Sequence, residues 1–144
     1  MMRAVATYEE TQGLQGVLDL PVLELVEPMP GFPDALRFAL AHLDEEGVLG
    51  ALRSLDQDGL QFLVVPAAQF YPSYEPVVSD EVVAELGIES VQDVLVLLVV
   101  HAGADLASTT VNLRAPLLVN TTTLKAAQVI LDDAALAVAA PLIP

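Results

Sequence analysis

Short apolar segments rich in Val and Leu alternate with Gly, Pro or Asp at intervals of eight to twelve residues along most of this chain. This spacing is typical of antiparallel sheet. The pattern predicts strands over residues 4–8, 16–20, 23–26, 36–43, 49–55, 60–65, 94–100, 109–114, 117–119 and 128–131. We therefore expect a mainly β fold: a small antiparallel barrel or sandwich in one domain, with one or two short helices.

Two of these segments carry stronger local signals. The run over 94–100 contains only Val and Leu and is predicted to be the most buried strand. The stretch from Asp56 to Gly59 ends in Asp-Gly, which favours a tight hairpin between Leu52 and Leu60.

Two proline-rich stretches are predicted to be fixed loops that carry aromatic side chains. Residues 28–33 contain three prolines and Gly31, and they place Phe32 at a tight bend. Residues 69–76 hold Phe70, Tyr71 and Tyr74 between prolines, which a central strand does not tolerate. These aromatic side chains either pack down as lids on the ends of the β core or serve as anchors for a partner.

One helix is predicted between Ser79, a good N-cap, and Gly87, a good C-terminal stop. A second short turn is expected from Ser90, because Asp93 follows at the capping-box spacing. The last residues, 132–144, are rich in Ala and carry no charge after Asp133. We interpret residues 1–133 as the domain and residues 134–144 as a docked or frayed apolar tail outside the core.

The charge balance restricts the classes of partner. Five basic residues against twenty acidic ones give a formal net charge of -15. Such a field repels phosphate, and the basic residues are scattered, so we expect no direct binding of nucleic acid. The acidity suits a basic protein partner and equally suits solubility alone.

The sequence has no cysteine, which excludes disulfides and cysteine-ligated metals. No signal-peptide pattern opens the chain, so we expect a cytoplasmic location. The longest apolar runs, 94–100 and 134–143, are far below the roughly 20 residues of a membrane-spanning helix, and we expect no membrane contact. The sequon at Asn120 is interpreted as strand and turn residues.

The search for catalytic parts finds no assembled set. The two histidines, His42 and His101, are far apart in sequence and each ends an apolar run. Neither shows a base-orienting partner, and no helical pair of histidines suggests a metal site. We expect no catalytic residues, no metal and no cofactor. A small metal-dependent or His-based hydrolase that uses His101 with nearby acids remains the alternative from another class.

Several stretches, in order and over about residues 14–132, together resemble the FliW flagellar assembly factor family. They are Met29-Pro30-Gly31-Phe32, Leu36-Arg37-Phe38, the hairpin over 56–62, Phe70-Tyr71-Pro72-Ser73-Tyr74-Glu75-Pro76, Ser79-Asp80-Glu81, Glu85-Leu86-Gly87-Ile88, Asp93-Val94-Leu95-Val96-Leu97, Thr110-Val111-Asn112-Leu113-Arg114-Ala115-Pro116, Val119-Asn120 and Gln128-Val129-Ile130-Leu131-Asp132. The chain differs from the family pattern at Pro28 and Met29, in the lack of bulky aromatics over 49–52, and in its Ala-rich end over 134–144.

The resemblance implies a small, acidic, β-barrel-like protein without catalytic activity that binds two proteins, the translational regulator CsrA and flagellin. In that picture the factor keeps CsrA from repressing translation of flagellin mRNA, and free flagellin competes CsrA away. Loop chemistry and motif position together nominate the partner-binding residues, which are Phe32, Phe70, Tyr71, Tyr74, Glu75 and Asn112. The sequence leaves the oligomeric state open, and a homo-oligomeric structural β module is a further alternative.

Overall fold

A computed structural model describes residues 2–3 and 20–142 of the chain. The strands are β1 (Met2–Arg3), β2 (Val22–Leu25), β3 (Arg37–His42), β4 (Gly50–Ser54), β5 (Gln61–Pro66), β6 (Val77–Val78), β7 (Val94–His101), β8 (Thr110–Val111), β9 (Leu117–Asn120), β10 (Lys125–Gln128) and β11 (Ala140–Pro141). The helices are α2 (Ala67–Phe70) and α3 (Asp80–Leu86), with 3-10 turns at Val91–Asp93 and Leu106–Ser108. The strand predicted over 4–8, and the one predicted over 16–20 except its last residue, lie outside the described residues.

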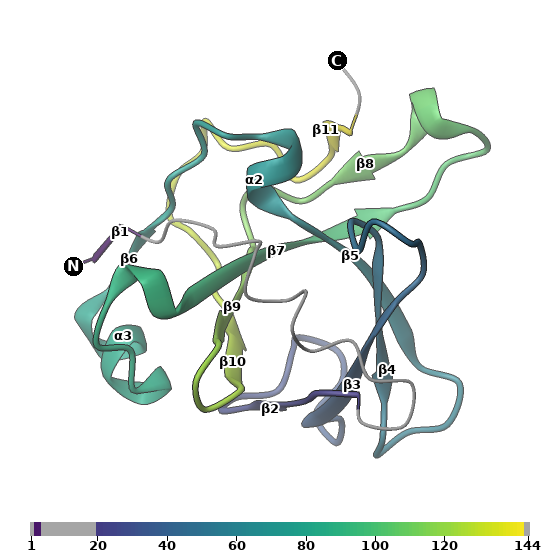
Figure 1. The fold of residues 1–144 in the computed structure, drawn as a ribbon. Helices are drawn as coiled ribbons and strands as arrows, with labels where there is room; N and C mark the ends of the chain where they lie inside the picture. Colours follow the sequence, from purple (N-terminus) through teal and green to yellow (C-terminus); the bar gives the residue numbers. More distant parts are fainter. Residues whose placement is uncertain (1, 4–19, 143–144) are drawn as a thin grey trace.

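Seven strands close into a barrel. They follow the order β7-β5-β4-β3-β2-β10-β9, and β9 pairs back onto β7, with Leu95 opposite Val119. Figure 1 shows the strands wrapped around one axis, with β2, β3 and β4 on the side away from α2. The mainly β prediction is confirmed, and the closing β7–β9 pair decides for a barrel over a sandwich.

One pairing departs from the antiparallel expectation. β10 runs parallel to β2, with Lys125 opposite Glu24 and Ala126 opposite Leu25. The two strands are far apart in sequence, so no tight turn constrains their relative direction. Local turn signals therefore predict the antiparallel hairpins and carry no information about this pair.

The strand β7 is buried on both faces. Leu95 and Leu97 point into the barrel interior, where they join Phe38 and Leu40 of β3 in one apolar cluster. The alternate residues of β7, such as Val96 and Leu98, belong to a second apolar cluster on the outer side of the barrel wall. Two-sided burial explains why residues 94–100 are continuously apolar, and it confirms their prediction as the most buried strand.

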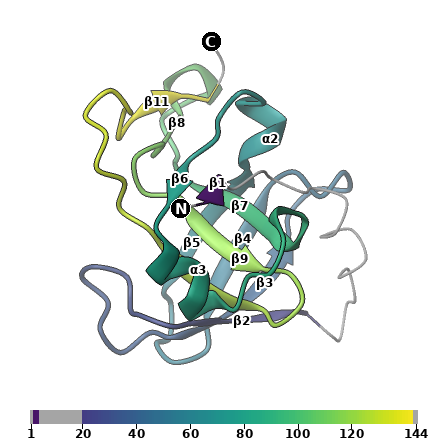
Figure 2. The same ribbon diagram turned by 90° about the vertical axis from the view of Figure 1, so that its left-hand side faces the viewer.

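The second cluster is covered by elements that lie outside the barrel: α2, β6, α3, β8 and β11. Figure 2 shows α3 against the barrel beside β9, with the C-terminal chain and β8 at the opposite end of the same side. The predicted caps of α3 are confirmed. The Ser79 hydroxyl accepts from the Val82 amide, and Gly87 ends the helix in the left-handed region at φ 66°.

Three local predictions are corrected. The last predicted strand, 128–131, is displaced: β10 ends at Gln128, and Val129 and Leu131 only donate single backbone bonds to the carbonyls of Pro116 and Arg114. Within 109–114, pairing stops after Val111, because the Asn112 side chain accepts from two following amides and forms a turn. The predicted loop 69–76 begins as the last two residues of α2.

The end of the chain contributes to the core, contrary to the expected tail outside it. β11 pairs with β8, with Ala140 opposite Val111, and both Ala140 and Leu142 are buried in the second cluster. The reason is tertiary, because β8 leaves an edge whose hydrogen-bonding groups need a partner.

None of the helices in residues 2–3 and 20–142 combines the length and apolar character that a bilayer crossing needs.

Candidate functional site

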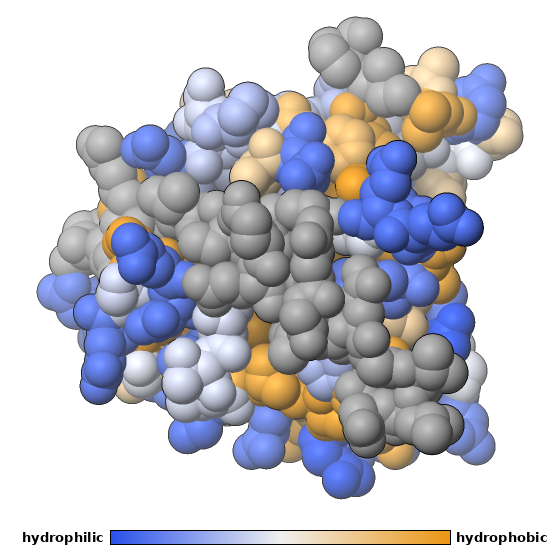
Figure 3. All heavy atoms as spheres, viewed as in Figure 1, coloured by the Kyte–Doolittle hydropathy of each residue, from blue (hydrophilic) through white to orange (hydrophobic). Residues whose placement is uncertain are grey.

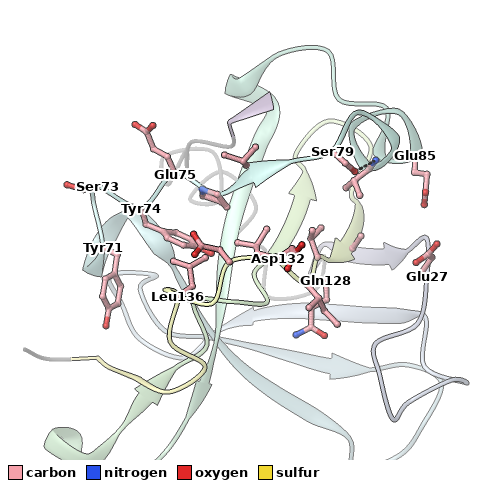
Figure 4. A pocket seen from close by; sticks show the side chains of 18 of the residues that line it. Glu27, Tyr71, Ser73, Tyr74, Glu75, Ser79, Glu85, Gln128, Asp132 and Leu136 are labelled. Atoms are coloured by element: carbon pink, nitrogen blue, oxygen red, sulfur yellow. Dashed lines mark hydrogen bonds between the residues drawn. The ribbon is translucent and has the colours of Figure 1, made fainter. Parts of the chain in front are cut away.

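A large groove lies on the outer cluster, with a volume of about 1130 Å³. One wall is the segment from Phe70 to Val77 together with α3, and the other is the segment from Ala127 to Leu136. We call this cavity the acid-rimmed groove. Figure 4 shows the groove, with Tyr71 and Ser73 toward one end and Glu27 and Glu85 toward the other.

The two tyrosines of the first wall are tied down by their hydroxyl groups. The Tyr74 hydroxyl donates to the Leu113 carbonyl at 2.5 Å, and the Tyr71 hydroxyl donates to the Pro141 carbonyl in β11. Burial raises the pKa of both phenols, so each stays a protonated donor at neutral pH. The aromatic segment therefore packs as a lid on the outer cluster, while its half-buried rings still line the groove.

The second wall is held by Arg114. Its Nε donates to the Leu136 carbonyl at 3.0 Å, and its Nη2 donates to the Ala134 carbonyl at 3.1 Å. The Asp133 carboxylate adds a local bond from the Ala135 amide at 3.0 Å. Arg114 is not among the residues that line the groove. Its guanidinium donates to backbone carbonyls of the wall and contributes no cation to the lining.

The lining is apolar in its floor and negative at its rim. The carboxylates that line it are Glu27, Glu75, Glu85, Asp132 and Asp133. No Lys, Arg or His is found among the described lining residues. Two lining side chains are unusually exposed for their type, Ile130 at 66% and Val77 at 46%. The groove is therefore suited to an apolar partner surface that carries positive charge.

The structure gathers four of the six nominated partner-binding residues, Phe70, Tyr71, Tyr74 and Glu75, along one wall of the groove. Phe32 lies elsewhere. Its ring packs edge-on against Phe62 at 5.2 Å, in the cluster that fills the barrel.

Asn112 is also outside the groove lining, and its side-chain oxygen accepts from the amides of Arg114 and Ala115. It shapes the turn whose Leu113 carbonyl receives the Tyr74 bond. Sequence reasoning missed the second wall entirely. The signal that was available there is the pair Asp132-Asp133 directly after the apolar residues Ile130 and Leu131.

The histidines and acids considered for catalysis are not brought together. His42 ends β3 opposite Gly50, and His101 ends β7 opposite Thr110, with β4 and β5 between the two strands. Both ring nitrogens of His42 are buried, and the part of the chain that the structure describes offers them no hydrogen-bond partner. Within the described ranges no group of three or more His, Cys, Asp or Glu residues is arranged to hold a metal ion.

Hydrophilic side chains are spread over the face shown in Figure 3, with hydrophobic ones reaching the surface between them.

One described ion pair joins Arg37 to Asp56 at 3.0 Å. The pKa of the Asp56 carboxyl is lowered, first by the amides of Arg37 and Leu36 and then by the guanidinium. This cluster fixes the start of β3 against the β4–β5 turn, away from the groove.

The sequence of the chain is similar to one family of known proteins. The family model described as "FliW protein" matches residues 7–142. A flagellar assembly factor FliW from Bacillus pumilus is 38% identical over 107 residues, covering 74% of this chain and 74% of that protein. One from Treponema denticola is 32% identical over 124 residues, covering 86% and 84%.

A crystal structure of the flagellar assembly factor FliW superimposes with a TM-score of 0.79, at 24% identity, over 99% of this chain and 98% of that one. That likeness supports the barrel fold independently of sequence identity. The family match and the sequence identities above lead to one conclusion. The chain belongs to the FliW family.

Proposed function

We propose that this chain is a non-enzymatic, cytoplasmic flagellar assembly factor that binds the translational regulator CsrA and flagellin. Bound to CsrA, it relieves repression of flagellin mRNA translation, and free flagellin competes CsrA away. The observation that carries the proposal is the family match over residues 7–142. The relatives compared above are named flagellar assembly factors.

The charge of the chain supports an antagonist of an RNA-binding protein. A net charge of -15 on a protein held against CsrA places a repulsive field near any RNA that approaches the complex. The acid-rimmed groove adds a local feature of the same sign, since acids and no bases are found among its described lining residues. Both features favour basic protein surfaces as partners over nucleic acid.

The separation of His42 and His101 along the sheet favours binding over hydrolysis. Each histidine ends its own strand, so the pair does not form a nucleophile–base or metal-ligand arrangement. The alternative of a hydrolase based on His101 is tested by metal analysis of the purified protein and by comparing His101→Ala with the wild type. Stoichiometric metal or a lost turnover would replace the binding proposal with that alternative.

The decisive experiment is calorimetry of the purified chain with CsrA and with flagellin from the same organism. We expect both to bind, and we expect flagellin to displace CsrA from a preformed complex. A gel-shift assay with the flagellin mRNA leader then shows whether the chain releases CsrA from RNA. If neither protein binds, the proposal fails. Light scattering of the chain alone tests the homo-oligomeric alternative.

Phe32, Phe70, Tyr71, Tyr74, Glu75 and Asn112 remain our proposed partner contacts. We expect the double variant Tyr71→Ala, Tyr74→Ala to weaken partner binding by more than about 2 kcal/mol if the tyrosines are hot spots. The double variant Tyr71→Phe, Tyr74→Phe is the matched control, because it keeps both rings and removes the two hydroxyl bonds. Unchanged binding with lowered stability in the alanine variant would assign the tyrosines to the lid role alone.

A further inference from the structure

The turn between β4 and β5 holds two neighbouring residues that can react with each other. Asp58 is followed by Gly59, and the sequence contains no other Asp-Gly and no Asn-Gly pair. In such a pair the side-chain carboxyl carbon and the next backbone nitrogen close a five-membered ring, and glycine has no Cβ to obstruct their approach. The turn lies at the end of β5 away from α2 (Figure 1), and neither residue lines the acid-rimmed groove.

The structure leaves both reacting groups free. Asp58 and Gly59 are exposed. Within the described ranges, the Asp58 carboxylate has no hydrogen bond or ion pair, and the Gly59 amide donates to no acceptor. A Cβ at Gly59 would meet open space, with no contact within 4 Å. The ring can therefore close without displacing a neighbour.

The peptide unit that joins the two residues is also free to rotate. The Asp58 carbonyl accepts from no donor in the part of the chain that the structure describes. The turn is closed by one backbone bond, from the Leu60 amide to the Gln57 carbonyl at 3.3 Å, which is long for such a bond. Rotation of the 58–59 peptide unit toward the carboxyl group therefore strains this single weak bond.

Asp56, two residues earlier in the same turn, shows the opposite arrangement. Its carboxylate accepts from the amides of Leu36 and Arg37 at 2.9 and 2.8 Å. The backbone nitrogen that follows it, in Gln57, donates to the Ser54 hydroxyl at 2.9 Å. Both groups that would have to meet are held by other partners. The fold thus protects Asp56 and leaves Asp58 unprotected.

We propose that Asp58 and Gly59 form a self-modification site, which cyclises to a succinimide, reopens to isoaspartate, and so makes the chain a substrate for an isoaspartyl carboxyl methyltransferase. In the first step the Gly59 nitrogen bonds to Asp58 Cγ, a Cγ–O bond of the protonated carboxyl breaks, and the hydroxyl leaves with the amide proton as water. In the second step water adds to the main-chain carbonyl of Asp58 and breaks its bond to the nitrogen. One water is lost and one is regained, so no oxidant or other reactant is required.

The product changes the hairpin. Isoaspartate carries the main chain through the side-chain carbon, which adds one backbone atom between Gln57 and Gly59. Loop length fixes the register of a hairpin, and here the Ser54 amide donates to the Leu60 carbonyl at 3.0 Å across the turn. We expect the modified turn to loosen this end of β4 and β5, together with the Asp56 anchor at the start of β3.

The modified turn also presents a new chemical group, the former main-chain carboxyl of residue 58, at an exposed position. The methyltransferase transfers a methyl group from S-adenosylmethionine to an oxygen of that carboxylate. The Gly59 nitrogen then displaces methanol and restores the imide, which water opens in part to ordinary aspartate. This chemistry goes beyond the proposed function and involves neither CsrA nor flagellin.

The test ages the purified full chain in warm neutral buffer for several weeks and maps it with endoproteinase Asp-N, which cuts before aspartate and not before isoaspartate. We expect cutting before Asp58 to decline and cutting before Asp56 to persist. With radiolabelled S-adenosylmethionine and the methyltransferase, methyl incorporation at residue 58 should be on the order of tenfold above that at any other Asp, because exposed turns open most readily.

Two variants separate the effect of the fold from that of the dipeptide. Asp58→Glu keeps the charge but would need a six-membered ring, so we expect aged Asp58→Glu to take up no more methyl than the fresh wild type. Gln57→Gly places a glycine after Asp56. We expect Asp56 still to be modified roughly tenfold less than Asp58 in this variant, since its carboxylate keeps its bonds to Leu36 and Arg37.

Ageing the wild type in guanidinium chloride measures the same effect without a substitution. Modification at residue 58 should stay within about tenfold of its rate in the folded chain, because the fold does not protect it. Complete cutting before Asp58 after ageing, equal methylation of aged Asp58→Glu, or a much larger acceleration by denaturant would each overturn the proposal. Equal modification of Asp56 and Asp58 in folded Gln57→Gly would do the same.

Discussion

The phenolic oxygen of Tyr74 lies 2.5 Å from the carbonyl oxygen of Leu113, 39 residues further along the chain. This hydrogen bond joins one wall of the acid-rimmed groove to the turn after β8. The same turn begins the segment whose Arg114 holds the other wall. Both walls are therefore attached by hydrogen bonds to residues 112–114. The width of the groove depends on these few polar contacts outside the barrel.

Removing the Tyr74 hydroxyl should lower stability without disturbing the ring packing. We expect Tyr74→Phe to reduce the free energy of unfolding by about 1–2 kcal/mol, because the partly buried Leu113 carbonyl loses its donor. Urea denaturation followed by circular dichroism measures the change. Tyr71→Phe is the comparison, and its effect should be smaller because its bond to Pro141 lies at the surface.

Alkaline pH should destabilise the fold through the same residue. Burial raises the pKa of Tyr74 above its ordinary 10.0, so the folded state favours the neutral phenol. The contribution is complete below the unfolded pKa and is lost progressively as the pH rises above it. The unfolding free energy of the wild type should fall above about pH 10, and that of Tyr74→Phe should fall less steeply. Parallel slopes would contradict this assignment.

Acid should weaken the anchor at the start of β3. The Asp56 carboxylate accepts from the amides of Leu36 and Arg37 at 2.9 and 2.8 Å and from the Arg37 guanidinium at 3.0 Å. The backbone bonds to Arg37 and Leu36 are the main cause of its lowered pKa.

The resulting stabilisation is present above the ordinary value of 3.8 and is lost as the pH falls through the folded pKa. Asp56→Asn should lower the melting temperature at pH 7 and flatten the decline of stability in acid. Asp58→Asn, two residues on in the same turn, is the control and should change neither quantity.

The buried side chain of Asn120 should be essential to the packing of α3. Its amide nitrogen donates to the carbonyls of Leu86 and Gly87 at 2.8 and 3.2 Å, and its oxygen accepts from the amide of Thr122. At 2% exposure no water replaces these partners. We expect Asn120→Ala to cost about 3 kcal/mol in chemical denaturation. Asn112→Ala, at a half-buried turn, should cost about 1 kcal/mol. An equal loss of stability in the two variants would contradict the role of Asn120 in holding the end of α3.

The second groove wall should loosen when Arg114 loses its donors. Arg114→Met keeps the aliphatic stem and removes the bonds to the carbonyls of Ala134 and Leu136. We expect hydrogen exchange at the Leu113 amide, which donates to Ala137, to accelerate by about tenfold. Global stability should fall by about 1 kcal/mol. An exchange rate equal to that of the wild type would show that β11 alone holds the wall.

Much of the fold was predictable because its signals are local. The Asp56–Gly59 turn, the caps of α3 at Ser79 and Gly87, and the apolar run over 94–100 all appear in the structure where the pattern places them. A turn, a cap or a strand period is set by residues within a few positions of one another, so a single sequence is sufficient to indicate it.

The candidate site was predictable only in half. The aromatic residues between prolines mark the first wall, because that composition is locally unusual. The second wall is an irregular segment after β10, and its predicted strand over 128–131 is wrong because the register of β10 is set by pairing with β9 and β2. Phe32 has the same local signature as Phe70 but packs on Phe62 in the barrel cluster, which only the tertiary contact reveals.

By itself, the sequence determined an acidic, cysteine-free, mainly β domain with its hairpin, its capped helix and its most buried strand. Tertiary structure decided the closure of β7 onto β9, the parallel β2–β10 pair, and the docking of β11 onto β8. These contacts join residues far apart in sequence, so local patterns carry no information about them. The acid-rimmed groove depends on contacts of the same long-range kind, such as the bond from Tyr74 to the Leu113 carbonyl.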